Sequence, residues 1–177
     1  MIPLILKLKK SAHKEIAKAQ DLIVEVLYKT FSGAVMHGGT SIWRCYHGNR
    51  FSEDIDVYIS KDIDKINALF KGFEKAGFLI VKRKTTENAL YSNLKYDNTF
   101  VRFEALFKHV NGSLVEYETS SGALITIYSL TPEELVNEKA QTYLKRRKIR
   151  DLYDVFFLLR FVKDRASVTK VLNELIT

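Results

Sequence analysis

The sequence lacks the features that mark secreted and membrane proteins. It has one cysteine, Cys45, and no apolar run long enough to span a bilayer. A disulfide framework is therefore excluded, and the lack of a signal-peptide pattern favours a reducing cytoplasm without membrane contact. Cys45 itself is expected to be a small buried filler. The chain also has no internal repeat, no low-complexity segment and no linker that would mark an independent second domain.

The composition is that of a globular protein with an excess of positive charge. It has 177 residues, of which 46% are hydrophobic and 28% charged, and this suits a single domain with a compact core. The formal net charge is +7. That charge permits a polyanionic partner and suits a site that binds a nucleoside triphosphate.

Hydrophobic periodicity and turn residues predict an α+β fold, with a mixed β-sheet flanked by helices. The expected helices cover 7–30, 63–76, 132–147, 149–162 and 164–176, with a further helical turn from Thr40, and the expected strands cover 34–36, 54–59, 78–85, 89–96, 99–107, 114–117 and 124–128. Residues 1–130 are expected to form the core. Residues 131–177 are expected to form a C-terminal helical segment that completes the site.

Two carboxylates lie close together on one predicted strand. In the run from 54 to 59, Asp54 and Asp56 alternate with apolar residues, so both project from the same face. Because like charges repel, such a pair is stable when a cation lies between them, and hard oxygen ligands suit Mg²⁺. The alternative is a pair of aspartates on a solvated edge strand.

A glycine-rich turn precedes that strand. Gly38 and Gly39 let backbone N–H groups approach a phosphate, and Thr40 and Ser41 open a helix whose N-terminus favours an anion. An ordinary glycine turn is the alternative. The order of strand, glycine turn, helix and aspartate pair favours a site for a phosphate and a metal ion.

These two motifs together resemble the signature of the nucleotidyltransferase superfamily that includes DNA polymerase beta. More narrowly, they are similar to the AbiEii family, which comprises nucleotidyltransferase toxins of type IV toxin–antitoxin systems and their relatives. The residues that carry the resemblance are His37, Gly38, Gly39, Thr40, Arg50, Ser52, Asp54, Ile55 and Asp56. The resemblance implies a nucleoside triphosphate substrate and a cognate antitoxin. Characterised toxins of the family are longer, with a larger C-terminal helical half.

A third acid lies on the predicted strand 99–107. Alternation places Arg102 and Glu104 on one face of this strand, and Glu104 is the single acid in an otherwise apolar centre. A salt bridge between Glu104 and Arg102 or a neighbouring lysine is an equal alternative to a catalytic role. The resemblance implies that Glu104 is the third metal ligand, close enough to the attacking hydroxyl to assist its deprotonation.

A second informative stretch lies near the C-terminus. On a helix, Lys139 and Arg146 share one face, while Asp151 and Asp154 follow at the start of the next predicted helix. A solvated, charged helix face explains most such runs. The stretch also resembles the second AbiEii signature, a lysine followed at a distance by Arg-Asp-x-x-Asp. That resemblance implies that Lys139 contacts the triphosphate, Asp151 holds Lys139 or Arg150 or acts in the site, and Asp154 supports it.

The sequence therefore predicts an Mg²⁺-dependent nucleotidyltransferase that moves a nucleoside monophosphate from a triphosphate to an acceptor hydroxyl. The expected catalytic residues are Asp54, Asp56, Glu104, Lys139 and Asp151, the first three as metal ligands. The expected nucleotide-binding residues are Gly38, Gly39, Thr40, Ser41, Arg44, Arg50, Ser52, Lys139 and Arg146. The acceptor is an RNA 3′ end, as in tRNA, or a protein or small-molecule hydroxyl. A non-catalytic nucleotide- or RNA-binding relative is the alternative. Tyr91, Tyr96 and Tyr128 could stack a base, although tyrosines on strands commonly only pack.

Overall fold

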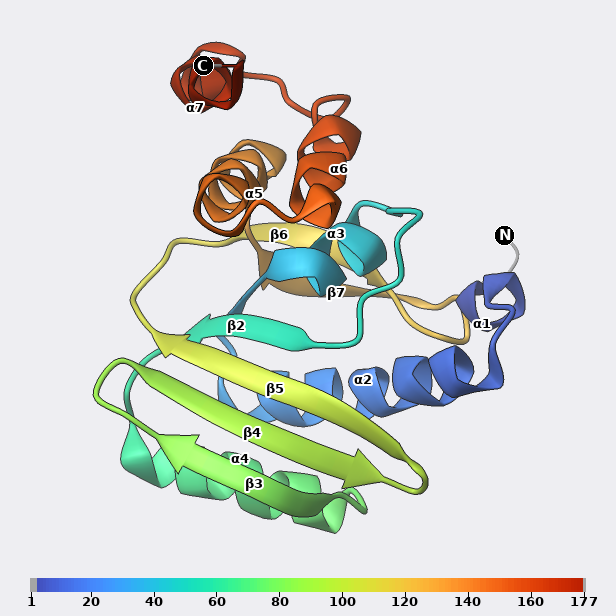
Figure 1. Ribbon diagram of the computed structural model, residues 1–177. Coiled ribbons are helices and arrows are strands. Elements are labelled where there is room, and N and C mark those ends of the chain that lie inside the picture. The colour runs from blue at the N-terminus through green and yellow to red at the C-terminus, as the bar shows by residue number, and fades with distance from the viewer. Residues whose placement is uncertain (1–2, 177) are drawn as a thin grey trace.

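The structure is a computed structural model that describes residues 3–176, and within them seven helices surround a seven-stranded sheet (Figure 1). The helices are α1 (Leu4–Lys7), α2 (Ser11–Thr30), α3 (Gly38–Cys45), α4 (Ile63–Lys75), α5 (Pro132–Arg146), α6 (Ile149–Leu158) and α7 (Ala166–Ile176). The strands are β1 (Val35–His37), β2 (Ile55–Ile59), β3 (Leu79–Thr85), β4 (Ala89–Tyr96), β5 (Thr99–Phe107), β6 (Ser113–Glu118) and β7 (Leu124–Ser129). The predicted class, helices around a mixed sheet, is confirmed.

The sheet order is β3-β4-β5-β2-β1-β7-β6. β2 runs parallel to β5 and β1 runs parallel to β7, whereas the other neighbouring strands are antiparallel. The parallel pairing of β2 with β5 places Asp56 directly opposite Glu104. Two segments almost fifty residues apart in sequence therefore carry acids side by side on adjacent strands.

Helices α2 and α4 cover one face of the sheet (Figure 1). The main hydrophobic core lies between them and the strands, and it includes Ile23 and Leu27 of α2, Phe73 of α4 and Phe103 of β5. Burial alternates along β5, as a strand with one covered face requires. The acids of β2 and β5 therefore lie on the face that α2 and α4 do not cover.

The C-terminal helices have a second core. Leu135, Val136 and Val155 of α5 and α6 pack with Val35 of β1 and Ile42 of α3. This packing holds α5 and α6 at the end of β1 and next to α3 (Figure 1). The C-terminal helices are thereby fixed beside the glycine turn, while the division of the chain at residues 130 and 131 stays a prediction.

Local sequence signals account for the helix starts. The Asp62 side chain accepts a hydrogen bond from the Lys65 N–H, and Thr131 with Glu134 forms the predicted capping box of α5. The prediction of one helix over 7–30 was wrong at its start. The chain is extended at Leu8, which separates α1 from α2, and α1 is tied to the β6–β7 turn by the Ile5 N–H, which donates to the Ser120 carbonyl at 3.0 Å.

The expected helix over 149–162 is also shorter in the structure, because α6 ends at Leu158. After it, the backbone N–H groups of Lys163 and Asp164 donate to Glu133 Oε1 at 2.6 and 3.2 Å. These bonds turn the chain back toward the start of α5, and no periodicity in the sequence reveals them. Among residues 3–176, no helix is long and apolar enough to cross a membrane.

Candidate active site

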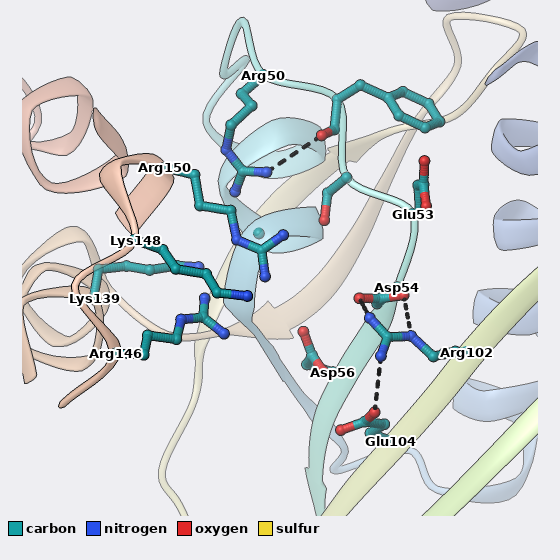
Figure 2. A pocket seen from close by; sticks show the side chains of 13 residues that line it. Arg50, Glu53, Asp54, Asp56, Arg102, Glu104, Lys139, Arg146, Lys148 and Arg150 are labelled. Carbon is teal, nitrogen blue, oxygen red and sulfur yellow. Dashed lines mark hydrogen bonds and ion pairs between the residues drawn. The ribbon is translucent and has the colours of Figure 1, made fainter. Parts of the chain in front are cut away.

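A cavity of about 570 Å³ opens between the end of the sheet and the turn from α5 to α6. Six of its lining side chains are basic and four are acidic. Figure 2 shows the acids of β2 and β5 on one side and basic side chains from the helical turn on the other. The lining residues are Gly39, Arg50, Phe51, Ser52, Glu53, Asp54, Asp56, Arg102, Glu104, Lys139, Arg146, Lys148 and Arg150. We call the side with the acids the acidic wall. We call the opposite side, formed by Arg50, Lys139, Arg146, Lys148 and Arg150, the basic wall.

The acidic wall consists of Asp54, Asp56 and Glu104. Asp56 and Glu104 are register partners on parallel strands, and Asp54 lies one residue before β2. All three line the cavity, so the alternation that predicted a shared face for Asp54 and Asp56 agrees with their positions. The wall thus brings together the three acids that the sequence analysis selected.

Arg102 lies between two of these acids (Figure 2). Its Nε donates to Asp54 Oδ1 at 2.8 Å, its Nη2 donates to Asp54 Oδ2, and its Nη1 lies 4.0 Å from Glu104 Oε1. Arg102 thus engages Asp54, and in residues 3–176 no three His, Cys, Asp or Glu side chains are gathered so that they could hold a metal ion. The guanidinium occupies the position of a counter-ion to the acidic wall.

Asp56 carries charge that the surrounding protein does not fully compensate. Burial, opposed by the nearby His37 and assisted by the negative charges of Asp54, Glu104 and Glu138, raises the pKa of its carboxyl to about 6. A divalent cation would relieve this repulsion, and hard carboxylate oxygens are the donors that Mg²⁺ takes. The chemistry of the donor set therefore fits a magnesium ion, provided that Asp54 exchanges Arg102 for it.

The glycine turn fits closely against the acidic wall. Gly38 has a positive φ of 71°, and a Cβ there would collide with the Asp56 carboxylate. A Cβ at Gly39 would lie 2.7 Å from Ser52 Oγ and 2.9 Å from Arg50 Nη2. Glycine is therefore required at position 38, whereas a side chain at position 39 would have to displace Ser52 and Arg50. Gly39 leaves its backbone facing the cavity.

The basic wall is held in place by two buried aspartates of α6. Asp151 accepts two hydrogen bonds from Arg146, from Nε and Nη2, both at 2.7 Å. Lys139 Nζ lies 3.2 Å from Asp154 Oδ2 and 3.7 Å from Asp151 Oδ1. Burial disfavours the charged Asp151, but the Arg146 hydrogen bonds and the positive charges of Lys139, Arg146 and Arg150 together outweigh burial and hold the Asp151 pKa below its usual value. Both aspartates position the basic wall, and neither lines the cavity.

Arg50 joins the loop before β2 to the basic wall. Its Nε and Nη2 donate to the two carboxylate oxygens of Asp154 at 2.9 and 2.6 Å. Asp154 thus orients both Arg50 and Lys139, although the sequence suggested no partner for Arg50. A planar guanidinium and a carboxylate form a strong, directional pair when bound through two hydrogen bonds.

Four of the residues expected to bind the nucleotide do not line the cavity and have other partners. The first is Gly38, whose N–H donates to Glu138 Oε1 at 3.2 Å. Arg44 is fully buried, and its Nη2 donates to Asp21 Oδ1 at 2.7 Å and to the Ala17 carbonyl at 2.8 Å. The hydroxyl of Thr40 donates to the Asp54 carbonyl, and Ser41 Oγ lies 2.6 Å from Ser129 Oγ. Arg44, Thr40 and Ser41 stabilise the fold and do not line the cavity.

The structure also adds residues that the sequence analysis did not select for the site. Lys148, Arg150 and Glu53 line the cavity, and Glu138 contacts the glycine turn beside it. Glu138 Oε1 accepts a hydrogen bond from the Gly38 N–H at 3.2 Å, and its Oε2 lies 2.8 Å from His37 Nδ1. The charge run around Lys148 was a visible signal, but only the fold shows which of its members face the acids.

As expected, Cys45 is buried, and burial raises the pKa of its thiol to about 12.

Carboxylates on neighbouring strands of a mixed sheet, beside a glycine turn and opposite a basic wall, define a nucleotidyltransferase architecture. Solved structures share this fold. MenT4, a nucleotidyltransferase toxin from Mycobacterium tuberculosis H37Rv, matches 95% of this chain and 66% of its own with a TM-score of 0.68 and 20% identity. JHP933 from Helicobacter pylori matches 85% of this chain and 67% of its own, with a TM-score of 0.64 and 19% identity. The antibiotic-resistance factor ANT(2″)-Ia matches 88% of both chains with a TM-score of 0.58 and 10% identity.

At these identities the similarity concerns the fold, and this chain spans about two thirds of the length of MenT4. The family profile described as nucleotidyl transferase AbiEii toxin, type IV toxin–antitoxin system, matches residues 22–176. The chain therefore belongs to the AbiEii family of nucleotidyltransferase enzymes. No match is found among the curated proteins.

Proposed function

We propose that the protein transfers a nucleoside monophosphate from a nucleoside triphosphate to an acceptor hydroxyl, with Mg²⁺ held by Asp54, Asp56 and Glu104. The observation that carries the proposal is the pair of walls, with three carboxylates facing a cluster of lysines and arginines across one cavity. The acceptor oxygen forms a bond to the α-phosphorus, and the bond from that phosphorus to the pyrophosphate oxygen breaks. Pyrophosphate is the leaving group.

The acidic wall provides the cation site. Bound Mg²⁺ would neutralise phosphate charge and hold the reacting oxygens in line. For this, Asp54 must leave Arg102, whose side chain is 59% exposed and therefore able to turn away. Glu104 is partly exposed at the same place and can accept the proton of the acceptor hydroxyl.

The basic wall binds the triphosphate. Lys139 and Arg146 are fixed by Asp151 and Asp154, so little side-chain freedom is lost when a phosphate binds them. Lys148 and Arg150 add charge at the mouth of the cavity, and the backbone at Gly39 lies open between the walls. Two walls of opposite charge suit a substrate that is itself a magnesium–polyphosphate complex.

We propose an RNA 3′ end as the acceptor and a role as a toxin that a cognate antitoxin neutralises. Membership of a toxin family supports the second part. A cationic small molecule is a poorer acceptor, because basic side chains outnumber acidic ones around the cavity. A protein hydroxyl would serve the same chemistry and is an outcome of the test.

The test is a transfer assay with each α-labelled nucleoside triphosphate, Mg²⁺ and total cellular RNA. We expect label on RNA from the wild-type protein, and a loss of more than about a thousandfold in Asp56→Asn, because a metal ligand contributes several kcal/mol. The Glu116→Gln variant, altered at an exposed position on β6, is the matched control. Unchanged transfer in Asp56→Asn would refute the metal assignment. Label on protein would replace the RNA acceptor.

A further inference from the structure

The face of β3, β4 and β5 opposite α2 and α4 is open along its length (Figure 1). Register partners on adjacent strands point to the same side, and Arg83, which reaches Asn67 and Phe70 of α4, marks the covered side. The next residues along β3, Lys82 and Lys84, therefore lie on the open side. None of the described elements crosses in front of this surface.

Three rows of side chains cross the open surface. The rows, read from β3 through β4 to β5, are Leu79, Lys95 and Phe100; Lys82, Asn93 and Arg102; and Lys84, Tyr91 and Glu104. Tyr91 is 40% exposed, and Phe100, near the β4–β5 turn, is 49% exposed with Lys95 Nζ 5.9 Å from its ring centre. We call this surface the open sheet face.

We propose that the open sheet face binds a single-stranded RNA and leads its 3′ end to the acidic wall. The proposal rests on the proposed transfer function and adds where the acceptor lies. Exposed aromatic rings on a sheet stack bases, and flanking lysines contact the phosphates of the strand. Arg102 on this face is already paired with Asp54, so the positive charge for a ligand comes from three lysines, Lys82, Lys84 and Lys95. Lysines beside exposed aromatic rings suit a strand that has both phosphates and bases better than they suit an apolar protein surface.

The open sheet face is continuous with the site. The row Lys84, Tyr91 and Glu104 continues to Asp56 on β2, because Glu104 and Asp56 are also register partners. Three strand spacings separate its two ends, about 14 Å, a distance that a few nucleotides span. A base stacked on Tyr91 would therefore place the next nucleotide beside the proposed metal ligands, where a 3′-hydroxyl is required.

The test is direct binding of a fluorescent single-stranded RNA, followed by anisotropy without nucleoside triphosphate and with a chelator present. We expect Tyr91→Ser to weaken binding about tenfold and Tyr91→Phe, which keeps the ring, to bind like the wild type. Lys82→Ala with Lys84→Ala should reduce the slope of log affinity against log salt by about 1.4, since each lost phosphate contact removes about 0.7. Thermal unfolding checks that each variant is folded.

The matched control is Lys71→Ala with Lys75→Ala, two exposed lysines of α4 on the opposite side of the sheet. Equal losses in the control and the Lys82/Lys84 variant would overturn the inference, because net charge alone would then explain binding. Tighter binding of duplex RNA, or of the same sequence as DNA, would overturn it as well. Transfer to RNA that is unaffected in Tyr91→Ser would refute the open sheet face and leave the proposed function intact. Ring-dependent binding without any transfer would support RNA binding by the open sheet face and refute the proposed function.

Discussion

The two walls of the cavity carry opposite charges and are built in opposite ways. In the basic wall, three cations form ion pairs with buried carboxylates. Lys139 and Arg50 pair with Asp154, and Arg146 pairs with Asp151. In the acidic wall, Asp56 has a raised pKa, and the side-chain partner of Asp54 among residues 3–176 is the exposed Arg102. The basic wall is thus complete within the protein, whereas the acidic wall is completed by a ligand. Removing an aspartate that holds the basic wall should therefore lower the stability of the fold. Removing a carboxylate from the acidic wall should raise it.

The largest effect is expected from Asp154→Ala. This change leaves the Arg50 guanidinium without its two hydrogen bonds and the buried Lys139 with one, more distant, partner. Breaking a buried ion pair from one side costs about 3–5 kcal/mol. Urea unfolding monitored by circular dichroism should show that loss, with Glu116→Gln as the control. A change under about 1 kcal/mol would mean that the basic wall is not held by Asp154.

The second prediction concerns the charge that Lys139 brings to the cavity. Lys139→Gln should reduce transfer about 100- to 1000-fold, as expected when one fixed donor to the reacting phosphates is lost. Steady-state kinetics with varied triphosphate would measure it. Lys145→Gln, an exposed change on the same helix that leaves the cavity lining intact, is the control. Equal rates in the two variants would contradict a role for the basic wall in catalysis.

The third prediction is a gain of stability in Asp56→Asn. Because the folded Asp56 has a pKa of about 6 against an ordinary 3.8, the folded state holds a proton that the unfolded state releases between those values. Wild-type stability should therefore fall as pH rises from about 4 to 6, and the variant should lack this fall. Above pH 6 the variant should be more stable by at most about 3 kcal/mol. The check is the urea midpoint of the wild type and of Asp56→Asn across this pH range. A difference between the two proteins that does not change with pH would mean that the Asp56 pKa is not raised in the folded state.

The smallest effect is expected at Arg102. If its guanidinium competes with a cation for Asp54, then Arg102→Gln should bind Mn²⁺ about two- to fivefold more tightly, in proportion to the modest strength of an exposed ion pair. Calorimetric titration with Mn²⁺ measures this without any reaction. The Mn²⁺ affinity of Arg102→Lys, which keeps the charge, should lie between the affinities of the wild type and Arg102→Gln. Weaker binding in Arg102→Gln would indicate that Arg102 supports the metal site instead.

The positions of the acids followed from a local signal, whereas the choice of Glu104 as a metal ligand rested on the family resemblance. Alternation placed Asp54 with Asp56 and Arg102 with Glu104, and all four side chains line the cavity. The nucleotide-binding residues were predicted less well. Arg44 lies only four residues beyond Thr40, in the most informative stretch, yet it points into the core toward Asp21. The direction of a side chain on a short helix depends on what that helix packs against, and no local pattern reveals this.

The sequence by itself determined the class of fold, the starts of α4 and α5, the acids of β2 and β5 and the family. These follow from periodicity, capping and motif, which act over a few residues. Only the tertiary structure decided that β5 pairs in parallel with β2, that Asp154 binds Arg50 across 104 positions, and that one face of β3–β5 stays open beside the site. Such contacts form because burying apolar surface selects one packing of the whole chain, and the polar side chains take the partners that this packing brings within reach.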